Sequence, residues 1–271
     1  VVFDNRSPSL RPPESQFLAP ENPDFSAPAI PAAGKCEVVC YTSDYDSSFK
    51  DLSHHQIRTV LEAWRDRTAE LSALPYIQHI APFENRGEEV GVTLNHPHGQ
   101  IYAYSYLPPK TARMLEVAKA HLEKTGRVLL DDILAREISD ESRVIVKNEH
   151  WIAFVPYASR YPFEIHIAPL SAVADLVALN EEQCNSFAPI AKEVLQRLDG
   201  VFGVTMPYIA SWHQAPVHEG RDALRLHWQI QSIRRAPGKL KYLAGSESAF
   251  GAFMMDLKPE QSAQQLRDVS L

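Results

Sequence analysis

Strand-like segments followed by one long helical segment occur twice along this chain, and this order limits the folds that it can adopt. In the first half, the β-branched and apolar residues 35–42 precede a helical pattern at 53–74, for which Ser53 is a suitable N-cap. In the second half, three strand-like stretches within residues 143–168 precede a helical pattern at 172–198. Neither GxGxxG nor GxxxxGK[ST] is present, which disfavours a parallel doubly wound sheet. The order therefore predicts two related α+β halves.

The rest of the chain repeats this style. Further strand-like stretches are expected at 76–84, 101–107, 208–212, 226–230 and 240–244, and further helices at 109–125, 131–139 and 259–269. We divide the chain into an N-terminal half, residues 1–112, and a C-terminal half, residues 113–271.

The composition bounds the setting in which this protein works. The 271 residues carry a formal net charge of −7, which argues against a broad surface for nucleic acid or for an anionic membrane. No apolar run approaches the roughly 18 residues of a membrane span. The 3 cysteines do not describe a disulfide scaffold, and the opening VVFDNRSPSL lacks the features of a signal peptide, so we expect a cytoplasmic protein. Because Val1 is not Met, we also expect an N-terminally incomplete chain.

The string HPHGQ concentrates groups that are capable of chemistry. On an extended chain His96, His98 and Gln100 point to one face. Pro97 has no backbone donor, so an edge or the end of a strand is predicted there, and Gly99 would let a ligand or another backbone approach closely. Two imidazoles and an amide on one face can bind a metal, attack phosphorus as a neutral nucleophile, or form a structural polar cluster.

HPHGQ, after FENRG, resembles the active-site motif of the galactose-1-phosphate uridylyltransferases, a branch of the histidine-triad superfamily. The resemblance covers essentially the whole chain, because family-like strings occur in family order: TAEL (68–71), FEN-x-G (83–87), HPHGQIYA-x-S-x-LP (96–108), EHW-x-A-x-VPY (149–157), PFE (162–164), PY-x-x-x-WH-x-AP (207–216), HWQ (227–229) and KPEQSAQQLRDV. It implies two histidine-triad-like halves, each an antiparallel sheet with helices packed on one side, and a homodimer.

The resemblance also implies a reaction. His98 would attack the α-phosphorus of UDP-glucose, glucose 1-phosphate would leave, and galactose 1-phosphate would take the uridylyl group from His98 to give UDP-galactose. A covalent relay splits the transfer between two bulky anions into two in-line steps. Gln100 stands where histidine-triad hydrolases have another His, and an amide favours transfer over hydrolysis.

Other residues match substrate-contacting positions of the family: Asn5, Glu84, Asn85, Thr93, Lys241, Tyr242 and Glu247. Asn85 and Thr93 would bind the phosphates and Asn5 the uridine, although a turn role for Asn5 and strand packing for Thr93 are open alternatives. The last three would bind the hexose phosphate, in this molecule or at the partner's nucleophile; Lys241 is alternatively a solvated surface residue. Residues before Val1 would complete the nucleotide pocket.

The resemblance leaves zinc at His96 open. In relatives with a zinc site this position is a ligand, together with a Cys-x-x-Cys pair upstream and one further residue. This chain has no such pair, and the further position falls near Tyr45, a poor zinc ligand. Cys36 and Cys40 favour packing, so either the pair lies in a missing N-terminal segment or the site is absent.

Some relatives also carry an iron site made by one Glu and three His. His213 and His227 match two of the histidine positions and Gln229 falls at the third, whereas the Glu position falls at about Met114, with Glu116 close by. We therefore predict no iron, and a hydrogen-bonded structural role for the two histidines.

Other interpretations remain. A related transferase or phosphorylase for ADP-sugars or dinucleoside polyphosphates would keep His98 and Gln100. A hydrolase would release free UMP without an acceptor, and a non-catalytic nucleotide-binding protein would bind its ligand without turnover. The stretch PFEIHIAP, with His166, is interpreted as the worn counterpart of the catalytic strand in the second half, with a structural role. Trp64, Trp151 and Trp212 are expected in a core or an interface.

Overall fold

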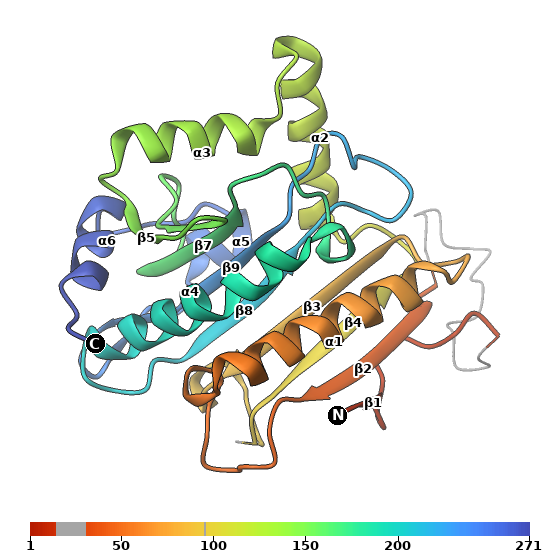
Figure 1. Ribbon diagram of the computed structural model, residues 1–271, viewed down its shortest axis with the longest axis horizontal. Helices are drawn as coiled ribbons and strands as arrows, with labels where there is room; N and C mark the ends of the chain where they lie inside the picture. Colours follow the sequence, from red (N-terminus) through yellow and green to blue (C-terminus); the bar gives the residue numbers. More distant parts are fainter. Residues whose placement is uncertain (15–30, 95) are drawn as a thin grey trace.

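The computed structural model describes residues 1–14, 31–94 and 96–271, which form strands and helices in alternation (Figure 1). The strands are β1 (Val2–Asp4), β2 (Gly34–Cys40), β3 (His79–Arg86), β4 (His98–Tyr104), β5 (Val144–Lys147), β6 (Trp151–Phe154), β7 (Phe163–Pro169), β8 (Tyr208–His213), β9 (His227–Ser232), β10 (Arg234–Ala236) and β11 (Lys239–Leu240). The α-helices are α1 (His54–Ser72), α2 (Pro109–Thr125), α3 (Leu129–Asp140), α4 (Glu181–Gly200), α5 (Gly245–Phe250) and α6 (Pro259–Arg267).

One antiparallel sheet runs through both halves. Within the described residues it contains nine strands in the order β1-β2-β4-β3-β8-β9-β7-β6-β5. The unit β2–α1–β3–β4 is repeated as β7–α4–β8–β9, and the two units meet where β3 pairs with β8. The predicted α+β class and the repeat are thus confirmed, with the halves fused edge to edge into one sheet.

The repeat also identifies the counterpart of the HPHGQ strand. β4 lies between β2 and β3, and the strand in the same position of the second unit is β9, between β7 and β8. The interpretation of the PFEIHIAP strand as that counterpart was wrong: this strand is β7, which corresponds to β2 because it precedes the helix of its unit.

Helices α1 and α4 lie side by side on one face of the sheet (Figure 1). Helix α3 lies on the opposite face, near the β5 edge of the sheet, where Leu134 packs with Ile152 and Phe154 of β6. Alternate residues of each strand therefore meet the two long helices, and the residues between them point to the other face.

Capping decides where the two long helices begin. Ser53 caps α1 as predicted, accepting a hydrogen bond from the Gln56 backbone N–H at 3.2 Å. The predicted helix at 172–198 begins later, because Asn180 forms a capping box with Gln183 ahead of α4. The predicted strand at 240–244 is reduced to β11, and the residues from Gly245 onward form α5.

The core is an aromatic cluster shared by both halves. Trp64 of α1 lies 6.0 Å from Trp212 of β8, centroid to centroid, and Phe187 of α4 contacts Trp212 at 5.2 Å. Trp151, Trp228 and Phe49 are buried in the same hydrophobic cluster. The tryptophans therefore belong to the core, and each half buries aromatic surface of the other.

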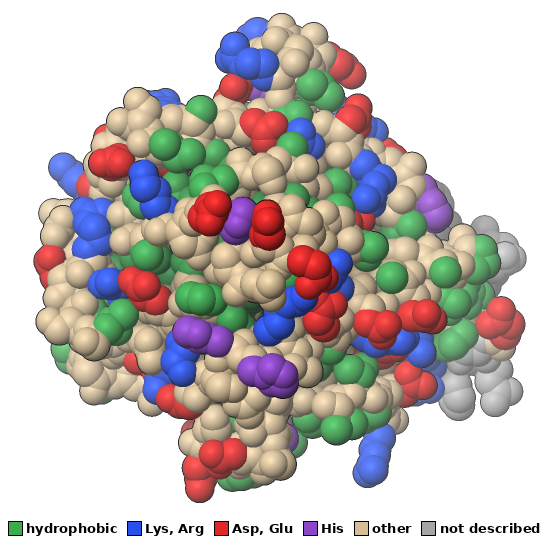
Figure 2. Space-filling model, in the orientation of Figure 1, with side chains coloured by type: hydrophobic (Ala, Val, Ile, Leu, Met, Phe, Trp, Pro, Cys, Tyr) green, Lys and Arg blue, Asp and Glu red, His purple; other side chains and the backbone are tan. Residues whose placement is uncertain are grey.

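The face that carries α1 and α4 mixes acidic and basic side chains without a large patch of one sign (Figure 2). Among the described helices, none is both long and apolar enough to cross a membrane.

Replacing Phe187 by Ala is expected to lower the free energy of unfolding by about 3–5 kcal/mol, because it empties a fully buried site against Trp151, Trp212 and Trp228. The matched control Phe250→Ala changes a ring that is 85% exposed and should stay within about 0.5 kcal/mol of the parent. Urea unfolding followed by tryptophan fluorescence measures both. Equal losses for the two variants would contradict the shared core.

Candidate functional site

His98 is the first residue of β4, a strand inside the sheet. β4 pairs with β2 on one side, where His98 faces Cys40, and with β3 on the other. Pro97 precedes the first ladder residue, so its missing N–H costs the sheet no hydrogen bond. The prediction of a strand end is confirmed, and that of an edge strand is not.

A backbone carbonyl fixes the proton on the His98 ring. Nδ1 of His98 lies 2.7 Å from the carbonyl oxygen of His96. Because a carbonyl oxygen can only accept, Nδ1 carries the proton and donates it. In the neutral ring Nε2 then carries the free lone pair, which is the tautomer that can act as a nucleophile at this nitrogen.

The predicted phosphate-binding residues gather around this ring. His98, Gln100, Asn85 and Thr93 line one cavity of about 120 Å³. Gln100 follows His98 by two residues on the same strand face, whereas Thr93 arrives through the long β3–β4 connection. An adjoining cavity of about 60 Å³ is lined by His96, His98 and Asn85 among others. The structure thus brings together polar groups that could bind a phosphate on both sides of His98.

Position 99 requires glycine because the Tyr41 side chain approaches the backbone of β4 closely on the helix-covered face of the sheet. A Cβ atom at this position would overlap the hydroxyl of Tyr41 and would lie 2.9 Å from the carbonyl oxygen of Phe83. The backbone N–H of Tyr41 also donates to the Pro97 carbonyl at 3.1 Å. The expected close approach therefore comes from the protein's own tyrosine on the helix side. Tyr41 therefore packs against the helix-facing side of β4 and supports the strand that carries His98.

Glu84 lies on the opposite side of the sheet from His98. It neighbours Asn85 on β3, so the two side chains point to opposite faces, and of the two only Asn85 lies on the face of His98. The Glu84 carboxylate is 4% exposed and accepts a hydrogen bond from the Tyr208 hydroxyl at 3.0 Å. Glu84 also lines the cavity of about 60 Å³ beside His98, although its carboxylate is buried among core residues, so its contact with substrate stays a prediction.

Burial also changes the acidity of Glu84. It raises the pKa of this carboxyl to about 7, against the opposing effects of Arg86 and the Tyr208 hydrogen bond. The second carboxyl oxygen of Glu84 and the Tyr41 hydroxyl have no hydrogen-bond partner among the described residues. A neutral, protonated Glu84 therefore suits this site better than a charged one.

His96 does not lie in a zinc site that the described residues complete. Its ring is 6.0 Å from that of Tyr45, centroid to centroid, and a neutral phenol is a poor ligand. No group of three or more His, Cys, Asp or Glu side chains in residues 1–14, 31–94 and 96–271 is arranged to hold a metal ion. The residues present do not fit tetrahedral zinc.

The remaining predicted residues lie elsewhere. The Asn5 side chain accepts a hydrogen bond from the Ser7 backbone N–H at 2.9 Å, which is a turn role. Lys241 donates to Glu247 at 2.9 Å, and this pairing, followed by backbone hydrogen bonds, lowers the Glu247 pKa to about 2. Tyr242 is 72% exposed. The two cavities beside His98 are lined by none of these four residues.

A second polar cluster occupies the same sheet face in the C-terminal half. The rings of His166 and His213 lie 5.0 and 5.1 Å from that of His227, centroid to centroid. Burial lowers the pKa of His227 to about 3, and it also lowers the pKa of His213 well below its ordinary value, helped by the charges of Lys110 and His227. These two imidazoles are therefore neutral near pH 7.

Lys110 and Glu164 complete this cluster, and sequence reasoning missed both. Burial, with Arg160 nearby, lowers the Lys110 pKa to about 8, whereas hydrogen bonding to His166 and the charge of Arg160 outweigh burial and lower the Glu164 pKa to about 2. The alternation of Glu164 and His166 in β7 was a usable signal for one face. Nothing in the sequence linked either residue to Lys110.

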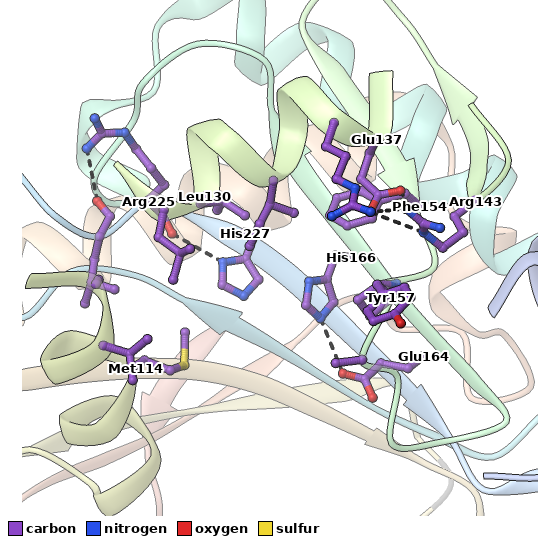
Figure 3. Close-up of a pocket in the computed structure, with 18 of the residues that line it drawn as sticks. Met114, Leu130, Glu137, Arg143, Phe154, Tyr157, Glu164, His166, Arg225 and His227 are labelled. Carbon is purple, nitrogen blue, oxygen red and sulfur yellow. Dashed lines mark hydrogen bonds and ion pairs between the residues drawn. The ribbon is translucent and has the colours of Figure 1, made fainter. Parts of the chain in front are cut away.

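A cavity of about 550 Å³, larger than the two beside His98, lies next to this second cluster and away from His98. Figure 3 shows His166 and His227 pointing into it from β7 and β9, with Met114 facing His227. The walls are mostly apolar and include Leu130 and Phe154. We nevertheless place the candidate site in the smaller cavities at His98, because the amide and hydroxyl groups that could bind a phosphate line the cavity there.

Comparison with known proteins adds to this geometry. Residues 1–108 match the model of the family "galactose-1-phosphate uridyl transferase, N-terminal domain", and residues 114–271 match that of its C-terminal domain. The galactose-1-phosphate uridylyltransferase of Streptomyces lividans is 42% identical over all of this chain and 73% of its own length. That of Thermotoga maritima is 34% identical over all of this chain and 85% of its own length. A solved uridylyltransferase structure, 32% identical, superposes with a TM-score of 0.91 and covers 98% of this chain and 83% of that one.

Glu84→Gln is expected to remove a pH dependence of stability. Folded Glu84 keeps its proton up to a pKa of about 7, whereas an unfolded glutamate releases it at the ordinary value of 4.5, so the folded state binds more protons in that window. Raising the pH from 5 to 8 should therefore destabilise the parent by about 2.5 kcal/mol relative to the variant. Urea unfolding of both proteins across this range measures the difference, and parallel pH profiles would refute it.

Proposed function

This chain belongs to the galactose-1-phosphate uridylyltransferase family, and we propose that His98 is the residue that carries the uridylyl group. The enzyme transfers UMP from UDP-glucose to galactose 1-phosphate. The observation that carries the proposal for His98 is its hydrogen bond to the His96 carbonyl, because in the neutral ring this bond puts the lone pair on Nε2, beside a polar cavity.

The first step needs no proton transfer. Nε2 of His98 forms a bond to the α-phosphorus, and the bond from this phosphorus to the bridging oxygen breaks. Glucose 1-phosphate leaves as an anion that is stable near pH 7 without added protons. The ring gains positive charge when Nε2 is substituted, and the His96 carbonyl, still accepting from Nδ1–H, stabilises that charge.

The second step reverses the first with another acceptor. A phosphate oxygen of galactose 1-phosphate attacks the same phosphorus, UDP-galactose forms, and Nε2 recovers its lone pair. Asn85 and Thr93 are proposed to hold the phosphoryl oxygens from the cavity walls. Gln100 can hydrogen-bond an oxygen in the same way, but its amide cannot activate water, and transfer is thereby favoured over hydrolysis.

The hexose end of the site is proposed to need a second copy of this chain. Lys241, Tyr242 and Glu247 match hexose-phosphate positions of the family, yet they do not line the cavities at this chain's own His98. A homodimer in which each chain supplies these residues to its partner would reconcile the two facts.

The free cysteines Cys36, Cys40 and Cys184 suit the reducing cytoplasm, which we propose as the location.

The decisive test is the mass of the intact protein after brief mixing with UDP-glucose and no acceptor. The parent should gain one uridylyl group and lose it again when galactose 1-phosphate is added, whereas His98→Ala should gain none. An adduct with ADP-glucose only would keep His98 and overturn the substrate. No adduct with any nucleotide sugar would sink the proposal.

Gln100→His is expected to raise the release of free UMP from the uridylylated enzyme by about tenfold or more, because an imidazole can activate water where an amide cannot. Gln100→Ala serves as the matched control, since it removes the amide without adding a titratable group. Chromatography of UMP without acceptor measures both. Equal hydrolysis by the two variants would show that the amide does not protect the intermediate.

A further inference from the structure

A chain of charged and polar groups joins the first turn of α2 to strands β9 and β7. Nζ of Lys110 donates to Oε1 of Gln229 at 2.7 Å and lies 3.4 Å from Nε2 of His213. The side-chain nitrogen of Gln229 donates to the carboxylate of Glu164. Glu164 in turn accepts from the Arg160 backbone N–H at 2.6 Å and from its guanidinium at 3.0 Å. Four segments are thereby connected through one buried amide.

The neighbours of Gln229 leave its amide one orientation. The carbonyl oxygen must face Lys110, because an ammonium only donates, and the NH₂ group must face Glu164, because a carboxylate only accepts. The positive charge of Lys110 therefore lies at one end of the amide and the negative charge of Glu164 at the other. This alternation of charge and dipole satisfies groups that would be costly to bury alone.

The same neighbours do not suit a second metal ion. His213 and His227 match metal ligands of some relatives, but Nε2 of His213 already faces the Lys110 ammonium at 3.4 Å and the Ser211 hydroxyl at 3.2 Å. Met114, near the family's carboxylate position, brings an uncharged thioether toward His227 (Figure 3), whereas the nearby carboxylate of Glu116 is exposed and pairs with Arg113 at 2.6 Å. No metal-holding group of His, Cys, Asp and Glu is arranged there among the described residues.

We propose that the Lys110 ammonium is the resident cation of this cluster and has the structural role there that a metal ion has elsewhere. Like a metal ion, it attracts the lone pair of a neutral imidazole and an amide oxygen from separate strands. Unlike a metal ion, it is covalently part of α2, so the link forms with folding and needs no loading. The contacts of Lys110 therefore anchor α2 to the sheet. Along the chain, α2 is the next element after β4, the strand that carries His98.

The test uses Lys110→Met, which keeps most of the stem and removes the charge. Its midpoint of thermal unfolding at pH 7 should fall by about 3–6 °C, because hydrogen bonds to a charged group are lost. Lys124→Met, an exposed lysine on the same helix, is the matched control and should keep the parent's midpoint. Lys110→Arg, which keeps a cation, should recover part of the loss. Gln229→Leu combined with Lys110→Met should lose less than the two single losses added together.

Metal content is the second measurement, and it does not depend on the Lys110 variants folding. His213→Ala should leave the iron and zinc content per chain, measured by mass spectrometry of the purified protein, equal to that of the parent. Loss of one metal ion per chain in His213→Ala would overturn the proposal. An unchanged midpoint in Lys110→Met would overturn it as well. Neither outcome bears on the transfer reaction at His98, which its own mass measurement tests.

Discussion

The sealing of one sheet face by α1 and α4 is the constraint on which the rest of this molecule depends. The aromatic cluster around Trp64, Trp212 and Phe187 occupies that face in both halves, so alternate residues of every central strand are committed to the core. Polar side chains that do chemistry must then come from the intervening positions. His98 and Gln100 on β4, and His227 and Gln229 on β9, lie on that other face for the same reason.

Sequence reasoning succeeded where the geometry is local. His98 and Gln100 share a face because strands alternate, and Ser53 ended up as a cap because its neighbour three residues on completes the box. The same alternation could have shown that the side chains of Glu84 and Asn85 cannot both lie on the sheet face of His98. Deciding which of them does so requires the register between β3 and β4, and no sequence pattern supplies it.

What the sequence could not provide depends on contacts between distant segments. Lys110 and Gln229 are more than a hundred positions apart, and their hydrogen bond exists only because β8 and β9 join the sheet beside the strands of the first half. The assignment of the PFEIHIAP strand failed for a related reason. Shared letters suggested a likeness to β4, whereas sheet order, which the letters do not encode, gave that place to β9. The two histidine clusters also differ in chemistry. Nε2 of His98 borders a polar cavity, whereas Nε2 of His213 faces the ammonium of Lys110.

The hydrogen bond between Nδ1 of His98 and the main-chain oxygen of His96 has an evolutionary consequence. In many enzymes a carboxylate side chain orients the catalytic imidazole, so a single codon change can remove the orienting group. Here the acceptor is a main-chain oxygen, which every amino acid carries. Substitution at position 96 can alter the side chain, and with it any metal chemistry, yet the atom that selects the tautomer persists. A change of side chain at position 96 therefore leaves in place the main-chain acceptor that holds the proton on Nδ1 of His98.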